Sequence, residues 1–527
     1  MSGNFYNLIM ATVPEFYSGD SGEFTIPKDR FLQYTEDHIK DEFESLDEDA
    51  ITKLKALPTI FATENEVTDA RIGKITDIKV SAHAVKAKYK FDGDRYPLTS
   101  GVLQENWQKL GISESNFEFH RGHWGVKECD LDDFYEEYLK SLTGIAHQLK
   151  DADKKVQLIY AFNGTGKTRL SRILKNLIAP KSDDEAEPSR NKFLYYNAFT
   201  EDLFYWDNDL QLDTDPKLKI QRNSFTGWVL QDQGQDQNII TNFQRYANDK
   251  LTPSFNEEYK ITDDDGKEIT VPAFSEVTFS LERGDDEPSG NLKISKGEES
   301  NFIWSIFYTL LDQIVTILNE PEEERTDQFN DLEYVFIDDP VSSLDENHLI
   351  ELAVNLAALI KAASAHLKFV ITTHNPLFYN VLHHELKMSD KNKKDGCYFL
   401  ERLEDGTFNL DVKGGSANKS FSYHLHIKKI IETAYAENKI EKYHFMLLRN
   451  LYEKTCGFLG YKHWTDLLPE DARDSYKRLI NTYSHRHLSY EEKAEPTNPE
   501  KQTVKFLLDH LSREYSYNVE ANNDTAN

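Results

Sequence analysis

The stretch YVFIDDPVSSLDENH, residues 334–348, decides the fold. Its apolar and aromatic run, Tyr334–Ile337, has the pattern of a fully buried strand, and the run ends at Asp338. A carboxylate at the tip of such a strand can hold Mg²⁺ or a water bound to it. Asp339 follows at the position suited to polarising an attacking water. The stretch therefore predicts a buried strand that delivers two carboxylates to one edge of a sheet.

A glycine-rich loop lies upstream, in VQLIYAFNGTGKTRLSR, residues 156–172. The apolar run Val156–Tyr160 predicts the strand before the loop, and a helical pattern follows the loop. Glycines let backbone N–H groups turn inward around phosphate oxygens. Lys167 can reach the β- and γ-phosphates, whereas Ala161 replaces the usual first glycine. The predicted nucleotide contacts of this loop are Asn163, Gly164, Thr165, Gly166, Lys167 and Thr168, and the predicted Mg²⁺ ligands are Thr168 and Asp338.

Three further motifs complete the pattern. The segment LKISKGEESNF, residues 292–302, predicts a helix whose N-terminus can bind the γ-phosphate of an opposing subunit. The segment Ser342–Asp345 matches a dimer-contacting loop, and the strand at residues 367–373 delivers a histidine that can sense the γ-phosphate. These motifs add Ser295, Gly297, Glu298 and Asp345 to the predicted nucleotide contacts, and they make Asp339 and His374 the predicted catalytic residues of NTP hydrolysis.

The order of these motifs is typical of an α/β ABC-type ATPase head, a P-loop NTPase that uses ATP or GTP with Mg²⁺. Because the signature helix acts on the nucleotide of a second head, we expect a head-to-head dimer. Asp339 is one methylene shorter than the glutamate usual at its position, so hydrolysis could be slow.

Other ATPases share these motifs. A transporter ATPase would need membrane partners. A chromosome-structure head would carry hundreds of heptad residues between Lys167 and Ser295, where only about 125 residues without sustained heptads stand here. A standalone defence-type ABC ATPase that signals to a separate effector stays open.

The bulk composition sets further limits. A chain of 527 residues with 39% hydrophobic residues suggests two to four packed domains. The net charge of −30 argues against broad, nonspecific nucleic-acid binding but leaves room for a local basic pocket. No uncharged apolar run of ~18 residues and no secretory signal are evident, so we expect no membrane span. Three distant cysteines favour a reducing cytoplasm over a disulfide framework or metal cluster.

The chain divides by pattern into three domains. Residues 1–148 predict an α+β domain with a regulatory or partner-binding role, residues 149–411 the ATPase head, and residues 412–527 a mainly helical domain. In the first, Arg71–Phe91 alternates like half-buried strands, and Leu131–Leu149 predicts one amphipathic helix. The pair His120 and His123 fits a turn with solvent-facing imidazoles better than a metal site, because no third ligand stands nearby.

The C-terminal domain carries a second set of chemical groups. In KYHFMLLRNLYEKTCGFLGY, residues 442–461, Arg449 and Glu453 lie one turn apart on one helical face. His485 follows Glu453 at the end of a further predicted helix. A cation, a carboxylate and an imidazole suit metal-independent RNA cleavage. By spacing alone, a surface ion pair and a helix-capping histidine are the commoner explanations of these residues.

From about Lys154 onward the chain resembles the PrrC family of anticodon nucleases. Stretches that carry the resemblance include LYYNAFTEDLFYWDNDLQ, SKGEESNFIWS, NKSFSYHLH and AEPTNPEKQTVKFLLDHL. The resemblance implies a HEPN-like nuclease domain whose triad would be Arg449, Glu453 and His485. It implies metal-independent cleavage of tRNA, usually lysine tRNA, in the anticodon loop beside the wobble base, leaving a 2′,3′-cyclic phosphate and a 5′-OH.

The resemblance also implies a regulated toxin. Family members are kept latent by a type I restriction–modification complex, are released during phage infection and block translation. NTP hydrolysis at the heads is coupled to activation, and a thymidine nucleotide such as dTTP stabilises the active form. The partners implied are therefore tRNA, further copies of the chain in a dimer or tetramer, and a silencing complex.

This chain departs from the family in two places. In KGGSANKSFSYHLH, residues 413–426, Ser416 stands where the family has an Asp proposed to read the wobble base, which puts lysine-tRNA specificity in doubt. Ser416, Lys419, His424 and His426 are the predicted tRNA contacts. About 150 residues precede the ATPase where the family has a short leader. A dimeric ATPase sensor that keeps the C-terminal helices as a binding platform is the alternative function.

Overall fold

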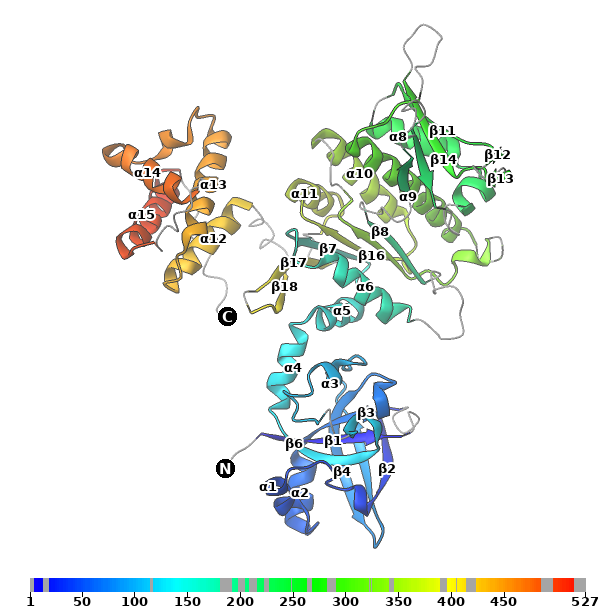
Figure 1. Ribbon diagram of the computed structural model, residues 1–527, viewed down its shortest axis with the longest axis vertical. Coiled ribbons are helices and arrows are strands. Elements are labelled where there is room, and N and C mark those ends of the chain that lie inside the picture. The colour runs from blue at the N-terminus through cyan, green and yellow to red at the C-terminus, as the bar shows by residue number, and fades with distance from the viewer. Residues whose placement is uncertain are drawn as a thin grey trace. The chain divides into compact units, whose positions relative to one another are not determined.

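Figure 1 shows the computed structural model of the chain. It describes residues 4–12, 19–113, 117–180, 192–197, 204–207, 216–221, 227–247, 249–262, 268–281, 291–321, 323, 325–340, 346–388, 396–403, 405–413, 423–484 and 496–515. Contacts group the described residues into two compact units, one within 1–344, 359–374 and 394–412, the other within 345–358, 375–393 and 413–527. Each unit is described by itself.

The first unit begins with a six-stranded sheet of order β2-β5-β4-β3-β1-β6. Its strands are β1 (Phe5–Ala11), β2 (Ser21–Pro27), β3 (Pro58–Thr63), β4 (Arg71–Val80), β5 (Ala84–Phe91) and β6 (His123–Glu128), and its helices are α1 (Asp37–Phe43), α2 (Glu48–Ala56) and α3 (Val102–Glu105). Along β5, Val85, Ala87, Tyr89 and Phe91 are buried and alternate with exposed lysines. The predicted half-buried strands at 71–91 are thus confirmed.

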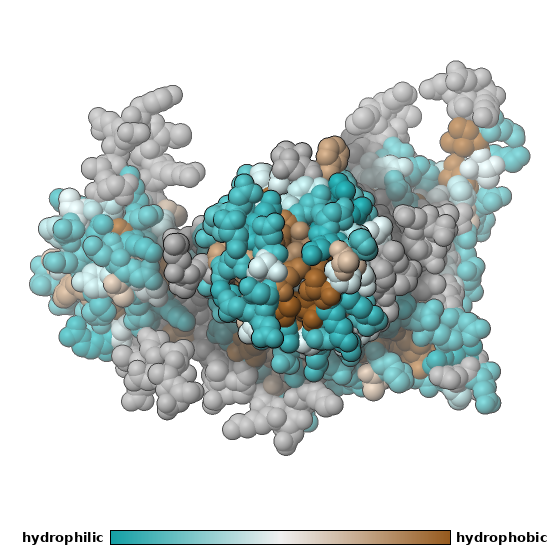
Figure 2. Space-filling view, turned by 90° about the horizontal axis from the view of Figure 1, so that it is seen from below, coloured by the Kyte–Doolittle hydropathy of each residue, from teal (hydrophilic) through white to brown (hydrophobic). Residues whose placement is uncertain are grey.

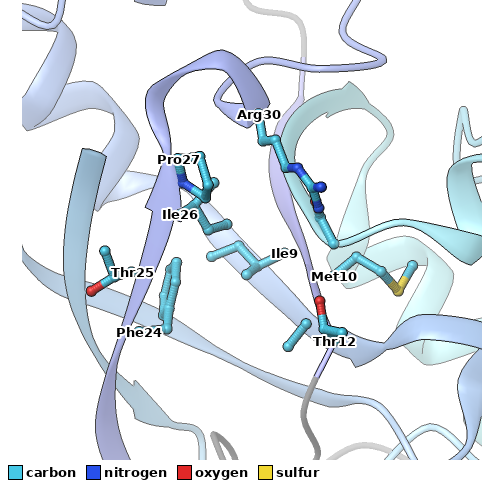
Figure 3. Close-up of a pocket in the computed structure, with 10 residues that line it drawn as sticks. Ile9, Met10, Thr12, Phe24, Thr25, Ile26, Pro27 and Arg30 are labelled. Carbon is cyan, nitrogen blue, oxygen red and sulfur yellow. The ribbon is translucent and has the colours of Figure 1, made fainter. Parts of the chain in front are cut away.

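A small cavity of about 60 Å³ lies between β1 and β2. Figure 3 shows Ile9 and Met10 on one side of it and Phe24 and Ile26 on the other, with Arg30 near its rim. The cavity is too small for a nucleotide or a drug-sized ligand, which need several hundred Å³. Figure 2 shows a mostly hydrophilic face, on which the hydrophobic residues at the centre of the view are framed by hydrophilic ones.

The two histidines of the first domain differ from each other. His120 is exposed, but His123 is fully buried in β6, so the expectation of two solvent-facing imidazoles is wrong for His123. Glu118, also fully buried, lies 3.3 Å from His123 Nε2 and 2.6 Å from Lys127 Nζ. Burial alone would raise the pKa of Glu118, but its contacts with His123 and Lys127 lower it. Burial lowers the pKa of Lys127, and the charge of Glu118 raises it by less, so the pKa of Lys127 is lowered overall.

Glu118→Gln should therefore destabilise the protein. The change leaves Lys127 buried without its counter-charge, which typically costs about 3–5 kcal/mol. Because the folded-state pKa of Glu118 is lowered, its contribution is present above the ordinary carboxyl pKa and is lost as pH falls through the lowered value. Urea unfolding at pH 7 and at stepwise lower pH measures both effects. The exposed Glu128→Gln is the control, and equal stability of the two variants would contradict the prediction.

Two helices replace the single one predicted at 131–149. Helix α4 (Leu131–Leu139) ends at Lys140, and α5 (Leu142–Asp151) begins after Ser141, whose hydroxyl accepts a bond from the Gly144 N–H and caps the helix. The apolar residues of α5 are Leu142, Ile145, Ala146 and Leu149, and they belong to the core around β7 and α6. The predicted boundary at 148/149 therefore falls inside a helix that packs with the ATPase.

The ATPase part is a mixed α/β fold, as predicted. Its main sheet has the order β18-β17-β7-β16-β15-β8, with β17 and β18 antiparallel and the other pairs parallel. The strands are β7 (Val156–Ala161), β8 (Phe193–Asn197), β15 (Tyr334–Asp338), β16 (Lys368–Thr373), β17 (Gly396–Arg402) and β18 (Phe408–Val412), and α6 (Lys167–Ile178) follows β7. The buried strand predicted at 334–337 is thus confirmed as β15, every residue of which is buried.

A second sheet, of order β11-β14-β10-β9, lies in the same unit. Its strands are β9 (Phe204–Asp207), β10 (Lys217–Ile220), β11 (Leu251–Phe255) and β14 (Glu276–Leu281), beside the hairpin β12 (Tyr259–Thr262) and β13 (Glu268–Val271) and the helices α8 (Asp236–Tyr246) and α9 (Lys296–Leu318). By length and composition alone, α9 is long and apolar enough to cross a membrane. Because 67% of its apolar window is buried inside the protein, α9 fits a core helix.

The helical C-terminal part is confirmed. Its helices are α12 (Tyr423–Ala436), α13 (Lys442–Leu459), α14 (Arg473–Ser484) and α15 (Asn498–Glu514), and the same unit holds α11 (Pro376–Glu385) and the first part of α10 (Glu346–Ala362). Buried side chains of α12–α15, among them Ile431, Leu448, Ile480 and Leu508, form one apolar core. The buried side chains of α13, including Phe445, Tyr452 and Cys456, belong to this core.

Candidate functional site

The glycine-rich loop joins the end of β7 to the start of α6. Gly164 and Gly166 have φ of 82° and 104°, a region that residues with a Cβ rarely adopt, so the loop turn depends on glycine there. The Lys167 ammonium donates to the Ala161 carbonyl at 3.2 Å and to Asn163 Oδ1 at 3.2 Å. The predicted loop residues thus surround one lysine at the N-terminus of a helix, the geometry that binds phosphate.

Asp338 lies beside this loop at the carboxyl end of β15. The Thr168 hydroxyl donates to its Oδ2 at 2.6 Å, and the Thr372 hydroxyl donates to its Oδ1 at 2.6 Å. Burial raises the pKa of Asp338 above its usual value, although both hydroxyl bonds oppose the rise. A hydroxyl and a carboxylate oxygen in contact are donors that suit Mg²⁺, so Thr168 and Asp338 fit the predicted metal site.

Two residues of β8 join Asp338 and were not predicted. Asn197 pairs in register with Asp338, and its amide donates to Asp338 Oδ2 at 3.4 Å. The Tyr195 hydroxyl donates to the same oxygen at 3.3 Å and accepts from Asn197 at 3.0 Å. The sequence signal was the polar end of the run FLYYN, but only the sheet order shows which strand it adjoins.

Asp339 holds a conformation that is uncommon for a residue with a side chain. Its φ is 51°, its carboxylate hydrogen-bonds to His374 Nδ1, and Lys167 Nζ lies 3.6 Å away. Burial would raise the pKa of Asp339, but the bond with His374 and the charge of Lys167 lower it. The carboxylate predicted to activate water and the histidine predicted to sense phosphate are therefore in contact, next to the lysine predicted to bind phosphate.

The residues predicted to contact the nucleotide of an opposing subunit lie at the N-terminus of α9. The Ser295 hydroxyl accepts from the Glu298 N–H at 3.3 Å, and Glu298 Oε2 accepts from the Ser295 N–H at 2.8 Å, which together form a capping box around Gly297. The next residue, Glu299, accepts the Trp206 indole N–H at 2.8 Å, which fixes this helix end to β9.

The pair predicted for nuclease chemistry is formed on α13. Arg449 Nε donates to Glu453 Oε1 at 2.8 Å. The guanidinium also donates from Nη1 to Asn481 Oδ1 of α14 at 3.3 Å and lies 5.6 Å from the centre of the Trp464 ring. Neither Asn481 nor Trp464 was predicted. Asp345, Ser416, Lys419 and His485 lie outside the described residues, as do the side chains of His424 and His426.

The glycine-rich loop, the buried strand β15 with the two carboxylates at its end and the mostly parallel sheet together define a P-loop ATPase. A family model described as an AAA domain matches residues 273–507. The chain is 59% identical over 401 residues to a protein of Escherichia coli named anticodon nuclease, an alignment that spans 71% of this chain and 96% of that protein. The chain belongs to the anticodon nuclease family and carries an extra N-terminal region.

Solved structures of SMC heads were also matched. An SMC head bound to the C-terminal winged-helix domain of ScpA aligns with a TM-score of 0.25 and 11% identity, covering 49% of this chain and 89% of that one. The SMC head domain from Thermotoga maritima aligns with a TM-score of 0.24 and 11% identity, covering 49% and 90%. Similarities this low support no inference about this chain.

Proposed function

We propose that this protein is an NTP-gated endoribonuclease that cleaves tRNA in the anticodon loop beside the wobble base. The observation that carries the proposal is the Arg449–Glu453 pair on α13, in a chain 59% identical to a protein named anticodon nuclease. Lysine tRNA is the first substrate to test, because the family resemblance implies it, although Ser416 replaces the residue thought to read the wobble base.

The cleavage we propose needs no metal. The 2′-hydroxyl oxygen attacks the adjacent phosphorus, and the bond to the 5′-oxygen breaks, leaving a 2′,3′-cyclic phosphate and a 5′-OH. Glu453 and His485 are the groups that can take the 2′-proton and give a proton to the leaving oxygen. Arg449 stabilises the negative charge that builds on the phosphorane oxygens. In this mechanism the side chains supply both the proton transfers and the charge stabilisation.

The ATPase site gates this chemistry in the proposal. Lys167 binds the phosphates of ATP or GTP, Thr168 and Asp338 hold the accompanying Mg²⁺, and Asp339 with His374 orients the attacking water. When bound, Mg²⁺ neutralises charge on the phosphates. Ser295, Gly297 and Glu298 of a second copy complete the site across a head-to-head dimer, which could pair further into a tetramer. A thymidine nucleotide is a candidate stabilising ligand.

The N-terminal region is proposed to control activation, as a sensor of the trigger or a contact for a silencing complex of the type I restriction–modification kind. Supporting this, the connection between α4 and α5 contacts β18, and the first residue of α5 lies beside the glycine-rich loop. The Phe408 N–H donates to the Lys140 carbonyl at 2.7 Å. A Cβ at Gly166 would lie 3.2 Å from Leu142 Cδ1 and 3.7 Å from Phe408. We propose a cytoplasmic toxin that blocks translation during phage infection.

Sequencing of cleaved ends tests the proposal. Total bacterial tRNA is incubated with the purified protein and ATP, GTP or dTTP, beside the His485→Ala variant. We expect a single cut in one anticodon loop with the wild-type protein, reduced about 100-fold or more in the variant because it loses a proton-transfer group. Intact tRNA under every nucleotide, despite measurable NTP turnover, would instead favour the ATPase sensor with a C-terminal binding platform.

A further inference from the structure

Arg449 is fixed by more than its partner on the same helix. An exposed pair at i and i+4 is worth only a few tenths of a kcal/mol and does not by itself hold a guanidinium in one orientation. Here the side chain of Glu453 is 46% exposed, whereas that of Arg449 is 22% exposed. The second contact of Arg449, through Nη1 to Asn481 Oδ1 at 3.3 Å, comes from a different helix.

Asn481 is itself held in place by packing. The preceding residue, Ile480, is fully buried in the apolar core of the domain. Beside it, the rings of Tyr483 and Phe445 pack 4.5 Å apart between α14 and α13. Two helices that pack this way keep the amide oxygen at a fixed distance from α13. A functional group supported by a rigid second element is the arrangement that maintains catalytic geometry.

The chemical type of residue 481 matters as much as its position. An amide oxygen accepts a hydrogen bond from a guanidinium but carries no charge. A carboxylate there would hold Arg449 more strongly but would give the site a net negative charge, because the Glu453 carboxylate already balances the charge of Arg449. A neutral acceptor therefore orients the guanidinium without adding a negative charge that would repel an anionic ligand.

We propose that Asn481 is a positioning residue for the nuclease reaction, which orients Arg449 toward the scissile phosphate without adding a negative charge to the site. The inference rests on the proposed function. It assigns Asn481 no contact with substrate.

The test compares Asn481→Asp and Asn481→Ala in the full-length protein. We expect both variants to cleave saturating tRNA about 10- to 100-fold more slowly, since a small misplacement or loss of charge at a catalytic group costs that much. Asn481→Asp should unfold at the same temperature as wild type or higher, because it gains an ion pair with Arg449. Asn481→Asp should therefore lose activity without losing thermal stability, which a purely structural role would not produce.

Asn438→Asp is the matched control, because Asn438 is exposed in the turn between α12 and α13 and gives the same change of charge. Wild-type cleavage by this control supports the proposal. Wild-type cleavage by Asn481→Asp would overturn it, as would a slow Asn481→Asp that has lost thermal stability. If the wild-type protein itself leaves tRNA intact, the proposed function fails and this inference fails with it.

Discussion

Lys167→Ala is expected to lower NTP hydrolysis by at least about 100-fold and to remove the nucleotide dependence of tRNA cleavage. Lys167 is the cation of the phosphate loop, with a side chain only 8% exposed. Its ammonium contacts loop carbonyls and lies 3.6 Å from Asp339. In the variant, two buried carboxylates, Asp338 and Asp339, face the nucleotide phosphates without this charge between them. Both nucleotide binding and NTP hydrolysis should therefore be weaker in this variant.

Release of phosphate from ATP and GTP, and binding of a fluorescent nucleotide, measure the two steps separately. Arg172→Ala is the control, because Arg172 is a basic and exposed residue of the same helix, α6. Loss of hydrolysis with tRNA cleavage that still responds to nucleotide would show that gating does not pass through this site. Unchanged hydrolysis would show that the loop does not bind the phosphates.

Arg449→Ala should lower the cleavage rate at saturating tRNA by about 10²–10³-fold, the usual cost of losing one donor that stabilises an oxyanion. Arg449→Lys should recover little of this loss. A lysine keeps the charge but has no planar fork with which to contact both Glu453 and Asn481. Arg449→Lys therefore distinguishes the contribution of the positive charge at residue 449 from the contribution of its hydrogen-bond geometry.

Single-turnover cleavage of a 5′-labelled tRNA by excess protein gives the rate, and the dependence of that rate on protein concentration gives the binding contribution. Arg513→Ala, an exposed position in the last turn of α15, is the control. NTP hydrolysis should be unchanged in all three variants if the two sites are separate. Cleavage by Arg449→Ala at the wild-type rate would remove Arg449 from the mechanism.

Local patterns in the sequence predicted those parts of the molecule that depend on neighbours along the chain. Apolar runs bounded by glycines and aspartates gave β7 and β15, and helical spacing placed Arg449 and Glu453 on one face. The contact between Asp339 and His374 could be anticipated because both follow strands of one sheet.

Features that depend on distant neighbours could not be predicted in this way. Asn197 reaches Asp338 only because β8 is the strand beside β15, and no local pattern gives the order of strands. His123 is buried because Glu118 and Lys127 balance one another around it. The division between α4 and α5 depends on the Ser141 cap, which interrupts an otherwise continuous amphipathic pattern.

Helix α5 also determines how this protein can be divided in the laboratory. Leu142 and Ile145 are buried in the core that α6 and the central strands share. A truncation that removes residues 1–145 would therefore remove buried side chains from the core of the ATPase. A loss of activity in that truncation could then not be attributed to a loss of regulation. A shortened protein that begins near Lys140, ahead of the capping Ser141, keeps this core whole. Because α5 packs into the core of the ATPase, a division between α4 and α5 separates the N-terminal domain without removing part of that core.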